Sequence, residues 1–126
     1  MRNLIAKLIR REKLANEEHL VLVLKYKDNV IGRLWSDKNK YYFQYDNKFK
    51  NTDLRPLTGF DDLEKVYESS WLFPYFEVRI PDLNRVDVAV MAKGEHLNNS
   101  SSPLRKLSVF GKKTINDPYE LTLVPA

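Results

Sequence analysis

The sequence has 126 residues, which is the size of a single domain. Its content of 43% hydrophobic and 30% charged residues is typical of a soluble globular protein and excludes a disordered or fibrous chain. The absence of cysteine excludes disulfides, thiol catalysis and thiolate metal sites, and it predicts a cytoplasmic, reducing location.

The charge is concentrated at one end of the sequence. The net charge is +4, and residues 1–15 contain five basic residues against one acidic residue, so the remainder is neutral. A neutral body lacks the broad electropositive face with which proteins follow nucleic-acid phosphates. The longest apolar run, Leu20–Leu24, is far shorter than the roughly 18 residues that span a bilayer. We therefore expect no membrane partner.

Residues 1–16 are predicted to form a basic amphipathic helix. Apolar residues recur there near the helical period, and most of the basic residues fall on the other side. Such a helix could pack on its own domain, dock on a partner, contact nucleic acid or a membrane, or fray, because isolated helices of about 15 residues are marginal in water. The sequence leaves these alternatives open.

Residues 17–126 are predicted to form the folded domain, which begins with an antiparallel meander. Three strands are expected, separated by polar turn residues: Leu20–Leu24, Val30–Trp35 and Tyr41–Tyr45. A polar connection over Asp46–Leu57 follows. Thr58 and Asp61 then resemble a helix start, and a short helix is predicted with one buried stripe made of Phe60, Leu63 and Val66.

Two more helices and a final strand complete the prediction. Pro81 and Asp82 are favourable first-turn residues, and apolar residues at helical spacing follow up to Gly94: Leu83, Val86, Val90 and Met91. Ser102 and Pro103 then form a cap and first-turn pair for a helix that ends at Gly111. Tyr119–Val124 alternates as a closing strand. The predicted class is α+β, with helices packed on an antiparallel sheet made of the meander and the C-terminal strand.

The residues needed for catalysis or cofactor binding are scattered. The four glycines are too far apart to form a phosphate-binding loop, and His19 and His96 do not have the spacing of a metal-ligand pair. Two carboxylate pairs, Glu17–Glu18 and Asp61–Asp62, consist of adjacent residues, which usually point apart. We therefore expect no enzyme, no metal and no cofactor.

Two aromatic segments are candidates for binding. Tyr41, Tyr42, Phe43 and Tyr45, beside several lysines, could form a stacking platform for single-stranded nucleic acid, although alternation along a strand assigns half of these rings to the core. The second segment, Trp71–Phe76, contains Pro74 and is followed by Pro81. It is either core or an exposed partner anchor, since Trp and Tyr are enriched in interface hot spots.

Several short motifs share their order with a known family. Together they resemble the N-terminal subdomain of the HipA family of bacterial serine/threonine kinase toxins, from Leu20 to Pro125. The basic residues 1–16 have no counterpart in that resemblance. The matching motifs are NVIGRL (29–34), YFQYD (42–46), RPL (55–57), FPYFEVRIPD (73–82), LSVFGKK (107–113) and DPYELTLVP (117–125).

The resemblance implies a partner and a role. In that family the kinase core follows this subdomain and carries the nucleotide loop, the catalytic base and the metal ligands, and the sequence contains none of these motifs. It is therefore similar to the small antitoxin of split, three-gene systems, which binds a HipA-like kinase toxin alongside a helix-turn-helix repressor. A steric mechanism would place a bulky anchor at the kinase active site. Trp71 is the first candidate for that anchor, followed by Phe73 and Tyr75.

Overall fold

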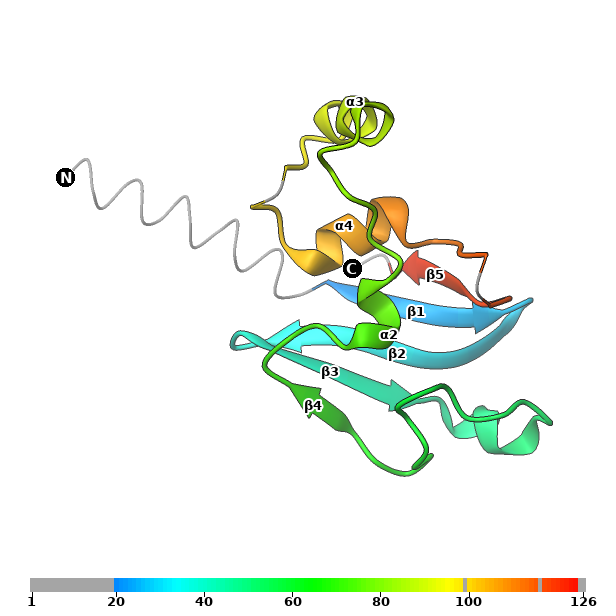
Figure 1. Ribbon diagram of the computed structural model, residues 1–126. Coiled ribbons are helices and arrows are strands. Elements are labelled where there is room, and N and C mark those ends of the chain that lie inside the picture. The colour runs from blue at the N-terminus through cyan, green and yellow to red at the C-terminus, as the bar shows by residue number, and fades with distance from the viewer. Residues whose placement is uncertain (1–19, 99, 116, 125–126) are drawn as a thin grey trace.

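A computed structural model describes residues 20–98, 100–115 and 117–124, so the predicted helix over residues 1–16 lies outside the described part. The fold is α+β, as expected. A five-stranded antiparallel sheet has the order β4-β3-β2-β1-β5, and helices cover one of its faces (Figure 1). The strands are β1 (Val21–Tyr26), β2 (Asn29–Asp37), β3 (Lys40–Tyr45), β4 (Tyr67–Ser69) and β5 (Glu120–Leu123).

The strand register separates a buried face from an outer face. Leu22, Leu34 and Phe43 are cross-strand partners in one row, and all three lie in the main core beneath the helices. The adjacent row pairs Val21 with Trp35 and Trp35 with Tyr42 on the outer face, because successive strand residues point to opposite sides. The predicted meander and closing strand are therefore confirmed.

The turn between β2 and β3 requires an unusual backbone conformation. Lys38 and Asn39 both have positive φ angles, of 49° and 66°. Two consecutive residues in this region form the type of two-residue turn whose twist matches that of a hairpin. This turn fixes the pairing of β2 with β3 and carries Asn39 to the edge of the surface described below.

The helices only partly match the prediction. α4 (Pro103–Phe110) begins where expected, with the Ser102 hydroxyl accepting a hydrogen bond from the Arg105 amide at 3.2 Å. α3 (Val86–Gly94) starts later than Pro81. The structure also contains two short helices that the sequence periodicity did not reveal, η1 (Asn47–Asn51) and α2 (Pro74–Glu77).

The predicted helix between Thr58 and Val66 is wrong. This segment consists of turns, after which the unpredicted strand β4 pairs with β3. Phe60 is buried, as expected, but Val66 is exposed. The Tyr67 ring packs edge-on against Phe60 at 4.9 Å, and the Tyr67 hydroxyl accepts a hydrogen bond from the Asp62 amide. These contacts hold the segment in turns and outweigh its local helical signals.

We expect the close approach of β2 to β3 to limit substitution at Gly32. A Cβ atom there would lie 2.6 Å from the Phe43 ring and 2.7 Å from the Gln44 carbonyl oxygen. Gly32→Ala should therefore lower the free energy of unfolding by about 1–3 kcal/mol, measured by chemical denaturation. Gly94→Ala is the matched control, because a Cβ there meets open space. Equal midpoints for the two variants would contradict this packing.

Candidate partner-binding surface

Trp71 projects from the surface immediately after β4. The residue is 81% exposed, and its backbone amide donates a hydrogen bond to the Ser69 hydroxyl at 3.1 Å. Tryptophan is usually largely buried in a folded domain. A large apolar ring left in water is characteristic of a residue that a partner covers.

The two residues after Trp71 are buried in the main core. Leu72 and Phe73 are 8% and 9% exposed, and the Phe73 ring packs edge-on against Phe60 at 5.1 Å. Phe73 also precedes α2, whose first residue is Pro74, and Pro fixes the backbone angle at that position. The base of the Trp71 side chain is therefore held in place, although the ring itself lies in solvent.

Tyr75 faces a different part of the molecule. Its ring is half-buried against Phe76 at 5.1 Å, and its hydroxyl donates a hydrogen bond to the Asp117 carboxylate at 2.8 Å. Burial, and then the hydrogen bond to Asp117, raise the pKa of Tyr75 above its ordinary value. Of the three predicted anchor residues, Trp71 is at the surface, Phe73 is internal, and Tyr75 lies in a separate polar cluster.

A groove of about 670 Å³ lies beside Trp71. It runs between the β2–β3 turn and the helices, and burial raises the pKa of Tyr41 in its wall. The groove and the projecting indole form one continuous surface, which we call the Trp71 surface. Sequence reasoning missed the groove because its lining comes from separate elements: Asn39, Tyr41, Ser70, Trp71, Leu72, Glu77, Ile80, Pro103 and Lys106.

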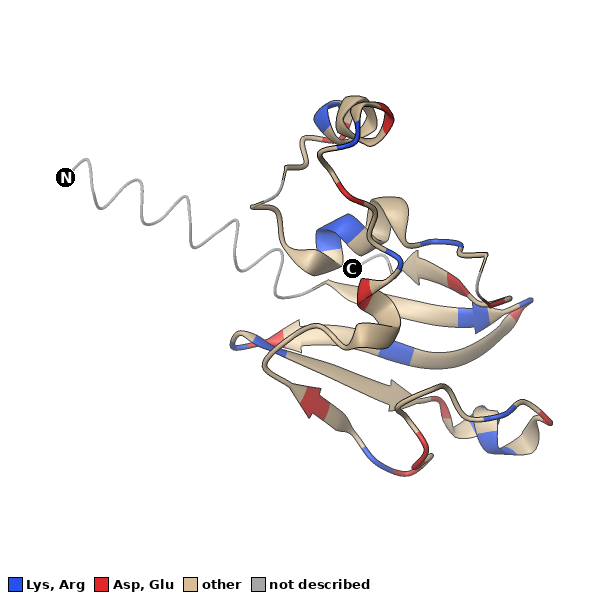
Figure 2. Cartoon of the chain, viewed as in Figure 1, with Lys and Arg blue, Asp and Glu red and all other residues tan. Residues whose placement is uncertain are grey.

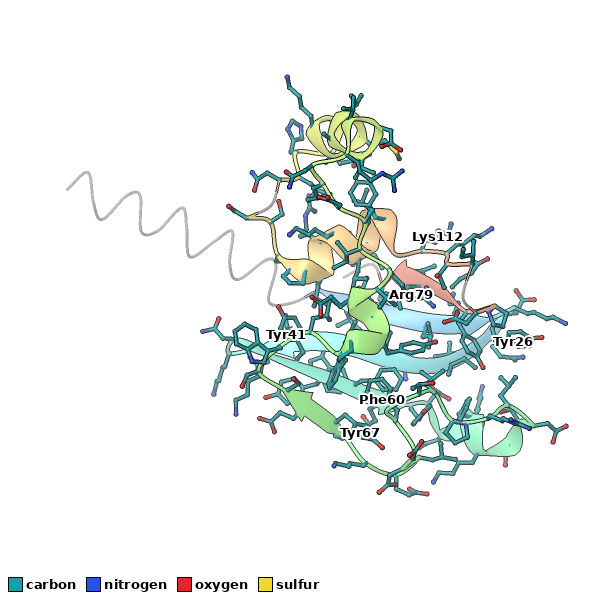
Figure 3. The ribbon with its side chains drawn as sticks, in the orientation of Figure 1. Tyr26, Tyr41, Phe60, Tyr67, Arg79 and Lys112 are labelled. Carbon is teal, nitrogen blue, oxygen red and sulfur yellow. The ribbon has the colours of Figure 1, made fainter. Side chains whose placement is uncertain are left out.

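A buried arginine ties the α2 segment to the C-terminal part of the sheet. Arg79 follows α2, and its side chain is fully buried (Figure 3). The guanidinium donates hydrogen bonds to the Asp117 carboxylate and the Gly111 carbonyl, each at 2.9 Å. It also donates to the Tyr119 carbonyl. The two charges lie 38 residues apart in the chain, so no local pattern predicts this pair.

The described residues contain no group of three or more His, Cys, Asp or Glu side chains arranged to hold a metal ion. Asp62, from one of the carboxylate pairs, accepts a hydrogen bond from the Glu64 amide and so belongs to a local turn. Among the helices of the described ranges, none is long and apolar enough to cross a membrane.

β3, which carries the four aromatic rings of the predicted stacking platform, presents little surface for stacking bases. Phe43 and Tyr45 are buried, and Tyr41 packs against the core, so Tyr42 alone of the four rings lies on the outer face, stacked on Trp35 at 5.6 Å. Two of the nearby cations are paired, Arg33 with Asp46 and Lys40 with Glu68. Figure 2 shows basic and acidic residues interleaved along the described part of the chain, with no single basic band there.

The family assignment comes from comparison with protein-family models. The model described as the HipA N-terminal domain matches residues 22–115, most of the chain. The chain belongs to this family. The match contains the NVIGRL, YFQYD, RPL, FPYFEVRIPD and LSVFGKK motifs on which the resemblance rested. No curated protein matches the sequence.

Loss of the buried ion pair should destabilise the domain. Asp117→Ala would leave the Arg79 guanidinium buried and uncompensated, which costs about 3–5 kcal/mol. We expect a correspondingly lower midpoint in chemical denaturation. Asp87→Ala is the matched control, because it removes the carboxylate that pairs with Arg85 in an exposed ion pair. A midpoint for Asp117→Ala equal to that of the control would show that the buried pair does not hold the segment.

Proposed function

We propose that the protein is a HipS-like antitoxin that binds and neutralises a HipA-like serine/threonine kinase toxin. Membership of the HipA N-terminal domain family supports a kinase partner of this type, since this domain is named for its place in such kinases. The proposal includes a helix-turn-helix repressor of the HipB type as a further member of the complex, and the kinase as a HipT-type protein encoded separately.

The observation that carries the proposal is the exposed Trp71 ring on a fixed base. An anchor residue contributes most when it fills a pocket in the partner and loses little conformational freedom on binding. Leu72 and Phe73 are already ordered in the core, so the backbone at Trp71 is positioned before any partner arrives. Tryptophan also adds a large buried area for only two rotatable side-chain bonds.

The proposed mechanism is steric. Insertion of the indole into the active-site region of the kinase would exclude substrate or prevent the lobes from closing around it. The antitoxin then needs no catalytic group of its own. Of the other two predicted anchor residues, Phe73 is buried in the core beside Trp71 and Tyr75 lies in the separate cluster with Asp117, so the proposal gives the anchor role to Trp71 alone.

The test is co-expression of the kinase toxin with Trp71→Ala. Because Trp71 is exposed, the variant should keep the wild-type melting temperature, since surface substitutions usually change stability little. It should nevertheless fail to restore growth. Trp35→Ala is the control, because it removes the only other tryptophan, from the outer face of the sheet. We expect this control to neutralise the toxin.

Two results would contradict the proposal. A folded Trp71→Ala variant that neutralises the toxin as well as the wild type does would remove Trp71 as the anchor. A wild-type protein that neither binds nor inhibits the co-expressed kinase toxin would remove the antitoxin function itself.

A further inference from the structure

The groove beside Trp71 contains an acidic side chain without a partner. Glu77, the last residue of α2, is exposed and lines this groove together with the Trp71 ring. Among the described residues, no hydrogen bond or ion pair involves the Glu77 carboxylate, whereas Glu68 on β4 pairs with Lys40 at 2.7 Å. The Glu77 carboxylate therefore depends on water for its hydrogen bonds in the isolated protein.

The rest of the groove does not neutralise this charge. Lys106, the other charged residue of the lining, already takes part in a different interaction within its own chain. The remaining side chains of the lining are neutral, and most of them are apolar or aromatic: Asn39, Tyr41, Ser70, Trp71, Leu72, Ile80 and Pro103. Within the described part of the chain, Glu77 is thus the charge in this groove that lacks a partner.

A protein that covers the Trp71 surface would remove water from Glu77. The carboxylate would then lose its hydrogen bonds to water, and a buried carboxylate is costly unless a positively charged donor takes the place of that water. Apolar contact with the indole alone does not offset this cost. A partner that binds tightly here therefore has to bring a positive charge to Glu77.

The aromatic side chains of the groove favour the same type of ligand. Trp71 is 81% exposed, so its ring remains accessible, and the Tyr41 ring forms part of the wall. Ammonium and guanidinium groups are attracted to the faces of Trp and Tyr rings. The aliphatic stems of Lys and Arg also pack well on apolar surface while the charged end reaches a carboxylate. The groove thus combines the features that receive a basic side chain.

We infer that Glu77 pairs with a basic side chain, lysine or arginine, of the same kinase that Trp71 blocks. The inference rests on the proposed function and adds to it the chemistry of a partner residue. The basic side chain enters the groove beside the indole and places its charge on Glu77. Trp71 obstructs the active site, whereas Glu77 contributes specificity, because a kinase with an acidic residue at the matching position would be repelled.

The experiment measures the association and dissociation rates of the purified full chain with the HipA-like kinase toxin. Glu77→Gln keeps the size of the side chain and removes its charge, so the dissociation constant should rise at least tenfold. The change should come mainly from faster dissociation, because a close ion pair acts after docking. Glu77→Lys places two positive charges together and should raise the dissociation constant at least a hundredfold. Both variants should keep the wild-type melting temperature, since Glu77 is exposed.

Glu95→Gln and Glu95→Lys are the matched controls. Glu95 follows α3, is exposed, lies outside the groove, and its carboxylate has no ion pair among the described residues. The control variants change the net charge of the protein by the same amounts, so they report the long-range attraction between the two proteins separately. Their dissociation rates should equal that of the wild type.

The outcomes distinguish the two proposals. If the wild type binds the kinase and Glu77→Gln dissociates within twofold of the wild-type rate, the charge pair is wrong and the antitoxin function stands. If the wild type does not bind the kinase, the proposed function fails. A Glu77→Gln variant that binds the kinase more tightly than the wild type would indicate that the chain's own basic residues 1–15 compete for the groove, and it would overturn the inference.

Discussion

The burial of Leu72 and Phe73 beside an exposed Trp71 is the constraint on which this account depends. Each of the two buried side chains contributes about 1.5–3 kcal/mol through removal of apolar surface from water. Their positions are set by a cluster of aromatic rings in which Phe43 and Phe60 approach to 4.6 Å. Since this cluster fixes the backbone on one side of Trp71, the indole projects from a defined place rather than from a loosely held loop.

The sheet supports the same surface from the other side. The β2–β3 turn brings Asn39 to the edge of the groove, and β4 pairs with β3 immediately before Trp71. The buried Arg79–Asp117 pair holds the segment after α2 against the loop that precedes β5. Contacts across the whole domain thus converge on one short segment, which is how a small domain can present a single side chain rigidly.

The amount of structure that the sequence predicts depends on the range of the contacts involved. β1–β3, α4 and β5 carry their own alternation, caps and turns, and these local signals agreed with the tertiary structure. The segment from Thr58 to Val66 carries local helix signals, but Tyr67 and Phe60 hold it in turns. β4 has only three residues, which is too short for any periodicity to identify.

The candidate surface was predictable only in part. The aromatic segment stood out from its composition, yet composition could not show that Trp71 is exposed whereas Phe73 is buried. α3 shows the same limit, because Val86, Val88 and Val90 have the same side chain, but only Val88 is buried in the small core cluster. Which ring or aliphatic group remains in water is decided by long-range packing.

Fluorine NMR of the protein labelled with 5-fluorotryptophan would test the central claim most directly. The chain has two tryptophans, Trp35 on the outer face of the sheet and Trp71. On saturation with the kinase, the Trp71 resonance should shift and lose its solvent-isotope effect, since the ring leaves water, while the Trp35 resonance stays unchanged. A saturated complex in which Trp71 keeps its full solvent-isotope effect would contradict the account.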